Sequence, residues 1–392
     1  MSSTTRIVDV VVIGGGHAGC EAAAAAARLG ADTLLLTINI DHIAQMSCNP
    51  AIGGIAKGQV VREVDALGGL MGQVADAACI QFRMLNRSKG PAVRSPRAQC
   101  DKLVYQRRMQ QVLERTPNLR IHQAQAVGFE TTGDRVTAVR TDLGDRVAAR
   151  AFVLTPGTFP GGTLHYGTCS VRGGRAGDPA ALALSQSLTE DLQLALARLK
   201  TGTPPRVPGR TIDFDALTRQ EPDEERLRFS FRATVDDPTL IGGELPQVPC
   251  YLGESTAETA ELVRANLDKA PLYAGRIAGI GTRYCPSFED KIVKFPHRPT
   301  HTIYVEPEGL YTEEYYLNGI STSLPPEVQI AMVRTLPGFE RAELSRYAYA
   351  IEYDFVLPHQ LDNTLAVRRG LNLFHAGQIN GTSGYEEAAG QG

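Results

Sequence analysis

The sequence predicts an α/β fold with a parallel β-sheet, interrupted by an inserted α+β domain. Residues 10–21, VVVIGGGHAGCE, join an apolar β-branched run to glycines at the G-x-G-x-x-G spacing. A second strand-like run ends in V-L-T-P-G-T near residue 155, and a third, residues 371–375, precedes the turn A-G-Q-I-N-G. Each run is a buried-strand pattern followed at once by a glycine turn.

The first stretch has the character of a dinucleotide-binding unit. Gly14, Gly16 and Gly19 supply the motif's glycines, and the alanine-rich run 22–27 predicts a helix that ends near Gly30. The glycine turn therefore lies at a helix N-terminus, where free N–H groups and the helix dipole favour a phosphate.

The acidic residue that usually follows the glycines is missing. The second predicted strand, residues 33–37, ends in Thr37 where a ribose-binding Asp or Glu is common. Asn39 and Asp41 are the nearest polar substitutes. The glycine motif alone is therefore only moderate support for a dinucleotide site.

Composition limits the class of protein. The 392 residues can bury a sizeable core, and the formal net charge of −3 means that any contact with nucleic acid must come from a local patch. Seven scattered cysteines fit free thiols in a reducing compartment better than a disulfide framework. The sequence has no H-E-x-x-H or C-x-x-C motif and no apolar run long enough to span a membrane. We therefore expect a cytoplasmic protein without a metal site.

Cys48 lies in an unusual loop. Residues 46–54, MSCNPAIGG, place a cysteine among a proline and two glycines, before a predicted helix whose apolar face is Ile55, Val60, Val64 and Leu67. A helix entrance lowers the pKa of a thiol and favours the nucleophilic thiolate. The alternative is that Cys48 is a small buried residue in a tight loop.

The strongest local charge follows. Eight basic residues face only Asp101, and they are Arg83, Arg87, Lys89, Arg94, Arg97, Lys102, Arg107 and Arg108. Ser95 and Pro96 predict the N-cap and first residue of a helix in the second half of this stretch. The cations suit phosphate contacts to RNA or to a flavin pyrophosphate, or else they form an ordinary solvated face.

The middle of the chain predicts an insertion. Runs 136–140 and 146–154 predict a hairpin, the loop 173–178 is glycine-rich, and KTGTPPRVPGR at 200–210 marks a boundary. Ser255 and Glu258 predict a capping box, 300–306 a strand, and Pro325–Pro326 the start of a helix. Cys285 stands directly before Pro286 and so outside helical geometry. We expect residues 1–200 and 336–392 to form one discontinuous domain, with 201–335 inserted.

Five blocks carry a close resemblance to a known family. They are GGGHAGCEAA (14–23), MSCNPAIGGIAKG (46–58), KTGTPPR (200–206), RYCPSFEDK (283–291) and AGQINGTSGYEEAA (376–389). Together they resemble the glucose-inhibited division protein A family, flavin-dependent enzymes of the tRNA uridine 5-carboxymethylaminomethyl modification. The resemblance covers essentially the whole chain and implies a Rossmann-like FAD-binding domain of the two-dinucleotide-binding flavoprotein type. It also implies that the C-terminal helical domain of the family is absent here.

The resemblance assigns roles to single residues. FAD would contact the glycine turn, two alanines and Gln378, that is Gly14, Gly15, Gly16, His17, Ala18, Gly19, Ala126, Ala181 and Gln378. NADH would use Gly281, Thr282, Arg283, Tyr284, Pro286, Ser287, Phe288, Glu289, Asp290, Lys291 and Phe295. Cys48 and Cys285 would be the reactive cysteines. Methylenetetrahydrofolate would supply carbon, and the family pairs with a tRNA-modifying GTPase and forms a homodimer.

The implied chemistry suits these residue types. Carbon C5 of uracil is a poor nucleophile until a group adds at C6, and a thiolate is a suitable adduct former. The rival functions are a folate- and FAD-dependent tRNA uridine methyltransferase, a flavin oxidoreductase of a small metabolite, and a scaffold that holds FAD structurally. Neither of the last two explains two cysteines in unusual loops.

Overall fold

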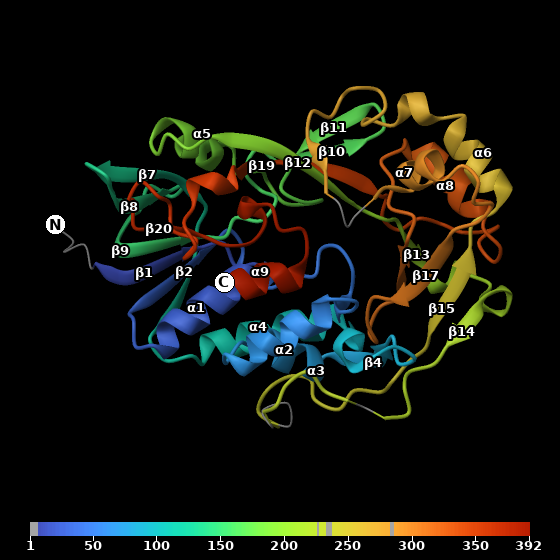
Figure 1. Cartoon of the computed structure of the whole chain (residues 1–392), viewed down its shortest axis with the longest axis horizontal. Coiled ribbons are helices and arrows are strands. Elements are labelled where there is room, and N and C mark those ends of the chain that lie inside the picture. The colour runs from blue at the N-terminus through green and yellow to red at the C-terminus, as the bar shows by residue number, and fades with distance from the viewer. Residues whose placement is uncertain (1–6, 226, 233–236, 283–285) are drawn as a thin grey trace.

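A computed structural model describes residues 7–225, 227–232, 237–282 and 286–392. Its largest sheet lies at the left of Figure 1, close to the N-terminus. Its strand order is β6-β2-β1-β9-β8-β7, with β20 beside β9. Strands β6, β2, β1, β9 and β20 are mutually parallel, whereas β9, β8 and β7 are antiparallel. The strands are β1 (Val8–Ile13), β2 (Thr33–Thr37), β6 (Leu119–Gln123), β7 (Ala126–Thr132), β8 (Arg135–Thr141), β9 (Arg146–Leu154) and β20 (Leu373–His375).

This sheet brings together the three distant stretches that combine a strand with a glycine turn. Strand β9 pairs with β1 on one side and with β20 on the other, although β20 follows more than two hundred residues later in the sequence. Buried apolar residues such as Val11, Phe152 and Leu373 form the core on one face. The helix α1 (His17–Arg28) covers the other face and lies beside the C-terminal helix α9 (Tyr385–Gln391) (Figure 1).

A small antiparallel sheet and three helices enclose the loop of Cys48. The sheet has the order β3-β5-β4, and these strands are β3 (Ala51–Gly53), β4 (Cys79–Leu85) and β5 (Ser95–Cys100). The helices are α2 (Lys57–Ala66), α3 (Met71–Ala77) and α4 (Lys102–Glu114). The predicted apolar face of α2 is half wrong, because Ile55 and Leu67 are 65% and 88% exposed while Val61 is fully buried.

The helix predicted to start at Ser95 is wrong. Residues 95–100 form strand β5, because their backbone pairs with β4 and Ser95 is buried with its side chain bonded to Gln59. The helix starts at Lys102, and Asp101 is the N-cap, whose carboxylate accepts from the N–H groups of Leu103 and Val104 at 3.0 Å. Tertiary pairing of the strand outweighed a local helix-start signal.

Two further sheets form the rest of the molecule. One has the order β11-β10-β19-β12-β16, from β10 (Thr163–Tyr166), β11 (Cys169–Arg172), β12 (Leu196–Thr203), β16 (Ile280–Gly281) and β19 (Tyr349–Val356). The other has the order β13-β18-β17-β15-β14, from β13 (Arg206–Pro208), β14 (Thr218–Gln220), β15 (Cys250–Glu254), β17 (Thr302–Pro307) and β18 (Glu314–Asn318). Helix α5 (Leu182–Glu190) packs against β7 and contributes to the core beneath the largest sheet.

Helices α6 (Ala257–Arg264), α7 (Phe288–Lys294) and α8 (Pro326–Arg334) pack on the last of these sheets (Figure 1). Helix α8 begins at the predicted proline pair. The capping box of α6 is formed by Thr256 and Thr259, so the predicted pair Ser255 and Glu258 is wrong by one residue. The oxygen of Ser255 instead accepts from the N–H of His301, which ties the segment to the strand β17.

The expected division into a domain of residues 1–200 and 336–392 and an insertion of residues 201–335 stays a prediction. Strand β12 crosses the expected boundary and pairs with β19 on one side and with β16, from the expected insertion, on the other. Phe229, which also belongs to the expected insertion, is buried in the core beside α3. Strands from both expected parts therefore share one sheet, and this sheet holds the cleft described next.

Candidate functional site: a cleft between a glycine turn and a cysteine

The turn between β1 and α1 is tightly built. Gly14 has φ +110°, and a Cβ atom there would overlap the carbonyl oxygen of Thr155. A Cβ at Gly19 would overlap the carbonyl oxygen of Gly14, so the helix packs on the strand only without a side chain. A Cβ at Gly16, the N-cap of α1, would meet nothing within 4 Å. The turn is therefore closed toward the sheet and open on the side where the helix N-terminus faces outward.

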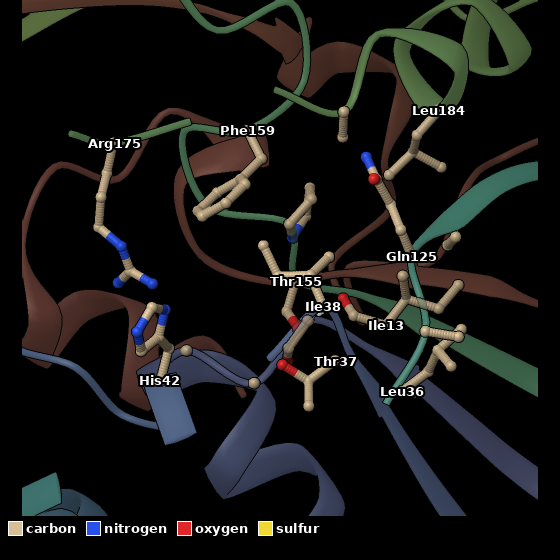
Figure 2. Close-up of a pocket in the computed structure, with 18 of the residues that line it drawn as sticks. Ile13, Leu36, Thr37, Ile38, His42, Gln125, Thr155, Phe159, Arg175 and Leu184 are labelled. Carbon is tan, nitrogen blue, oxygen red and sulfur yellow. Dashed lines mark hydrogen bonds between the residues drawn. The ribbon is translucent and has the colours of Figure 1, made fainter. Parts of the chain in front are cut away.

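The first pocket lies directly on this turn. It encloses about 700 Å³, including space open to solvent, and Figure 2 shows how its side chains converge. Its walls are mostly backbone and apolar side chains, namely Ile13, Leu36, Ala126, Ala181 and Leu184. The two alanines inferred from the resemblance therefore line this pocket, as do Gly14, Gly15 and Gly16.

Thr37 lines the first pocket. Asn39 and Asp41, the polar residues nearest to the position of the missing acidic residue, do not. The side chain of Asn39 accepts from the N–H of Asp41, and the carboxylate of Asp41 pairs with Arg107 at 3.1 Å. His42 and Gln45 are two polar residues that do line the pocket, and no sequence motif had indicated either of them.

A second pocket of about 1050 Å³ continues the first. Both pockets are lined by the same set of residues at their junction, namely Gly16, Gln45, Thr155, Gly157, Phe159 and Arg175, so they form one cleft. The second pocket also holds His17, Ala18, Cys48 and Gln378. Four stretches far apart in the sequence therefore meet in this cleft, and Cys48 lies at its far end from Ala126.

Three buried polar atoms at the cleft have no hydrogen-bond partner among the described residues. They are His17 Nε2, Gln45 Oε1 and Gln378 Oε1. Burial lowers the pKa of His17 to about 3, so the imidazole is neutral at physiological pH. Its ring is stacked on Tyr385, with ring centroids 4.3 Å apart. Buried polar atoms normally have partners, so these three indicate a polar ligand in the cleft.

Cys48 is half-buried, and its surroundings come from three elements. Its Sγ lies 3.3 Å from the hydroxyl of Tyr316 on β18 and 3.7 Å from the carbonyl oxygen of Gly202 on β12. Its N–H donates to the hydroxyl of Tyr385 at 2.6 Å. Strand β3 lies between Cys48 and α2, so the thiol is not directly at that helix entrance, contrary to the sequence-based expectation.

Arg206 holds the loop of Cys48 in place. Its guanidinium donates to the carbonyl oxygens of Ser47 and Cys48, at 3.3 and 2.9 Å, and lies over the ring of Tyr316 at 4.9 Å. The carboxylate of Glu308 accepts from Arg206 Nε at 2.9 Å and also pairs with Lys102. Burial alone would lower the pKa of Arg206, but the Glu308 charge outweighs it and raises the pKa. The buried, permanently charged guanidinium of Arg206 therefore fixes the backbone of the residue that carries the thiol.

The C-terminal segment holds the same loop from the other side. The carboxylate of Glu386 accepts from the N–H of Gly53 at 2.7 Å and pairs with Lys57 at 3.1 Å. Tyr385 and Glu386 thus connect α9 to both ends of the cysteine loop. The sequence marked this segment only as a helix start after Gln378.

The region expected to bind NADH, residues 281–295, lies far along the sequence from the glycine turn and from Cys48, and part of it is outside the described residues. Cys285, Arg283 and Tyr284 fall outside them. The described residues of this region, 281–282 and 286–295, line neither pocket of the cleft.

Several side chains of that region are used by the fold itself. Phe288 is fully buried in the core under the sheet of β17, and Ser287 caps α7 through Asp290. The carboxylate of Glu289 accepts from Thr322 and Ser323. The amine of Lys291 donates to the carbonyl oxygen of Gly319 at 2.7 Å. Of the described residues to which the resemblance assigns NADH contact, Gly281, Pro286 and Phe295 are exposed.

The basic stretch is mostly neutralised by partners inside the molecule. Arg97 pairs with Glu306 at 2.8 Å, Arg87 with Asp223 at 2.7 Å, and the guanidinium of Arg108 donates to a backbone carbonyl oxygen. None of the eight basic residues lines either pocket of the cleft. Much of the predicted phosphate-binding charge thus stabilises the fold.

Within the described ranges, we find no group of three or more His, Cys, Asp or Glu residues arranged to hold a metal ion. The helices in those ranges are too short or too polar to cross a membrane.

Comparisons with known proteins agree with this geometry. Residues 9–392 match the family model described as "Glucose inhibited division protein A". The tRNA uridine 5-carboxymethylaminomethyl modification enzyme MnmG of Geobacter metallireducens is 54% identical over 98% of this chain and 60% of its own length. The enzyme of the same name from Syntrophotalea carbinolica is 53% identical over the whole chain and 62% of its own length.

Solved structures give the same result. Aquifex aeolicus GidA in its form II crystal superposes with a TM-score of 0.91 at 49% identity, over 100% of this chain and 62% of that one. Its form I crystal gives 0.92 at 52% identity, over 98% and 64%. The chain thus spans about three fifths of the length of these relatives. These matches confirm the Rossmann-like, flavoprotein-type fold, and the chain belongs to the glucose-inhibited division protein A family.

Proposed function

We propose that this protein is an FAD-dependent tRNA-modifying enzyme that adds an aminomethyl or carboxymethylaminomethyl group to C5 of the wobble uridine. The reaction class is supported by relatives that are 53–54% identical and are named as tRNA uridine 5-carboxymethylaminomethyl modification enzymes. The observation that carries the proposal is that Cys48 lines the same cleft as the dinucleotide-type glycine turn.

The residues of the cleft fit FAD. Its adenosine would lie among the apolar walls of the first pocket, between Ala126 and Ala181. Its pyrophosphate would lie at Gly16, where no Cβ fills the space and the α1 N-terminus offers free N–H groups. The flavin half of the cofactor would lie in the second pocket. There it would form hydrogen bonds with the polar atoms that have no partner among the described residues, those of His17, Gln45 and Gln378. When bound, FAD would supply two-electron transfer.

Cys48 is the proposed nucleophile. Its thiolate would add to C6 of the uracil, so that the electron pair of the C5=C6 bond becomes available at C5. C5 would then attack the methylene carbon of methylenetetrahydrofolate, and one of the bonds from that carbon to a folate nitrogen would break, with the electron pair kept by the nitrogen. Loss of the C5 proton and departure of the thiolate then restore the ring. The hydroxyl of Tyr316 at 3.3 Å is in position to donate a hydrogen bond to the thiolate, and hydrogen bonding to a charged form favours that form. Arg206 keeps the loop in the geometry that allows this contact.

Cys285 is the proposed second cysteine. The N–H of Thr282 donates to the carbonyl oxygen of Lys200 on β12, and the carbonyl oxygen of Gly202 on the same strand lies 3.7 Å from Cys48 Sγ. We propose that Cys285 assists proton transfer or positioning near Cys48.

NADH would reduce the flavin from the region 281–295. Ser287, Phe288 and Glu289 are buried and have their contacts inside the fold. NADH would therefore contact the more accessible residues of this region directly, namely the exposed Gly281, Pro286 and Phe295 and the half-buried Thr282. Methylenetetrahydrofolate is the proposed carbon donor, with a partner GTPase and a homodimer as the proposed assembly. The location is proposed to be the cytoplasm, where its tRNA substrate would be.

Adduct trapping tests this function. Flavin-loaded protein is mixed with methylenetetrahydrofolate, NADH and tRNA that carries 5-fluorouridine at the wobble position. Fluorine at C5 prevents the final proton loss, so the adduct formed after carbon transfer cannot break down. A covalent complex is expected with the wild type and with Cys169→Ser, a matched control at an exposed thiol. It should vanish in Cys48→Ser and persist in Cys285→Ser, and the reverse result would exchange the roles of the two cysteines. Full modification of ordinary tRNA by both of these variants would contradict the proposal.

A further inference from the structure

A third pocket adjoins the cofactor cleft beside the cysteine loop. It has a volume of about 890 Å³, including space open to solvent. Gln45, Ser47, Arg175 and Tyr349 line both this pocket and the second pocket, and Ser47 is the neighbour of Cys48. A molecule in the third pocket would therefore lie next to whatever reacts at Cys48.

The lining of the third pocket is cationic. Lys102, Arg175, Arg206 and Arg346 line it, and no carboxylate does among the described residues. Lys102 and Arg206 are committed to Glu308. The other two retain donors, because the bonds described for them inside the molecule run from Nε, from Arg175 to Asp178 at 2.5 Å and from Arg346 to Glu314 at 2.9 Å. Their terminal amino groups remain for an anion.

Three tyrosine rings, those of Tyr166, Tyr347 and Tyr349, line the third pocket together with these guanidinium groups. Tyr349 is buried and lies against Tyr166, with ring centroids 5.6 Å apart. Tyr347 is 38% exposed, and its neighbour Arg346 is exposed as well. The pocket therefore combines a fixed aromatic floor with an accessible ring and guanidinium at its rim. Rings and cations in one groove are the features that bind single-stranded nucleic acid through base stacking and phosphate contact.

We propose that the third pocket binds the nucleotide next to the reacting uridine, with its phosphate on Arg346 and Arg175 and its base against Tyr347. This inference rests on the proposed tRNA substrate and adds where the RNA is held. Enzymes that act on a base displaced from its stack read the flanking nucleotides in this way. Tyr347 and Arg346 are exposed at the rim of the pocket and are therefore accessible to a nucleotide that is part of a longer RNA.

Fluorescence anisotropy with a labelled anticodon stem-loop RNA and the flavin-loaded protein tests the phosphate contact. Arg346→Ala is expected to weaken binding about fivefold and to reduce the slope of log affinity against log salt by roughly 0.7, the value for one lost contact to a single strand. Arg341→Ala is the matched control, because Arg341 is exposed and lies outside the pocket. Equal affinities and equal slopes for the wild type and Arg346→Ala would overturn the inference.

An abasic substitution tests the stacking contact. Tyr347→Ala should weaken binding to the normal hairpin severalfold, and Tyr347→Phe should restore it. With a hairpin that lacks the base next to the uridine, Tyr347→Ala should have no further effect, since the two changes remove the same contact. Tyr311→Ala, at a ring that is 77% exposed and outside the pocket, is the control. Additive effects of Tyr347→Ala and the abasic site would overturn the stacking contact.

Two other results separate the inference from the function on which it rests. If the wild type binds no hairpin at all, the proposed tRNA function fails together with the inference. If the wild type and both variants bind the hairpin equally but the variants lose affinity for methylenetetrahydrofolate, the pocket is a cosubstrate site. In that case the inference fails while the function stands.

Discussion

The two ends of the cleft are built from different kinds of residue. Around the glycine turn the walls are backbone, alanine and aliphatic side chains, with Gly14 and Gly19 packed so closely that no Cβ fits. At the other end, the loop of Cys48 is held by buried charges and hydroxyl groups, namely Arg206, Glu308, Tyr316 and Tyr385. The first end should therefore be sensitive to added atoms, and the second to lost charge or lost hydrogen bonds.

The largest expected effect comes from an added methyl group in the turn. Gly19→Ala should fail to fold or should lose roughly 4 kcal/mol or more of stability, because the new Cβ overlaps the backbone of Gly14. Gly16→Ala is the matched comparison, since its Cβ meets nothing within 4 Å. It should unfold at the same urea concentration as the flavin-free wild type but bind FAD much more weakly. Equal FAD affinity of Gly16→Ala and the wild type would show that the pyrophosphate does not lie there.

Removal of the charge at the other end should cost somewhat less. Glu308→Gln keeps the shape but leaves the guanidinium of Arg206, which is 5% exposed, without its counter-charge. Breaking one partner of a buried pair costs about 3–5 kcal/mol. Urea denaturation should detect this loss.

Glu343→Gln is the control for that experiment, because its pair with Arg210 is largely exposed and such pairs contribute at most about 1 kcal/mol. Equal losses in the two variants would mean that the charge beneath the cysteine loop is not buried in solution.

Stability should also depend on pH through His17. Its pKa is about 3 in the fold against 6.5 unfolded, because burial disfavours the charged ring. The unfolded chain therefore binds a proton that the folded chain does not, and stability is lost as the pH falls from 6.5 toward 3. One such group changes the free energy of unfolding by about 1.4 kcal/mol per pH unit. Urea denaturation at several pH values should give a shallower pH dependence for His17→Gln than for the wild type. Parallel curves would contradict a buried neutral His17.

The smallest expected effect is at the thiol. Tyr316→Phe removes one hydroxyl 3.3 Å from Cys48 Sγ, and a single hydrogen bond contributes about 1 kcal/mol. Alkylation of Cys48 by iodoacetamide at neutral pH should slow by roughly fivefold. Tyr315→Phe, on the same strand, should have no effect. An unchanged rate in Tyr316→Phe would show that the hydroxyl does not stabilise the thiolate.

The sequence predicted the glycine end far better than the cysteine end. Strand β2 (Thr33–Thr37), helix α1 and the return strand β20 follow from local periodicity and glycine spacing, which are short-range properties. Arg206, Tyr316 and Tyr385 reach Cys48 from positions 158, 268 and 337 residues away. Arg206 and Tyr385 lay in blocks that the sequence singled out, but nothing in the sequence placed either of them beside Cys48.

The same reason explains the wrong helix start at Ser95. Its local signal was sound, but residues 95–100 form a buried strand because β4 is there to pair with them. The basic stretch likewise suggested a phosphate site, although acidic partners such as Glu306 and Glu308 lie about 200 residues away in the sequence. Charge neutralisation by distant residues cannot be seen in a local pattern.

Protection of Cys48 by FAD tests the central claim most directly. Flavin-free and flavin-loaded protein are treated with iodoacetamide, and alkylation at each cysteine is followed by mass spectrometry. If the thiol and the cofactor share one cleft, FAD should slow the alkylation of Cys48 at least severalfold and leave the exposed Cys169 unaffected. Equal rates at Cys48 with and without FAD would contradict the claim.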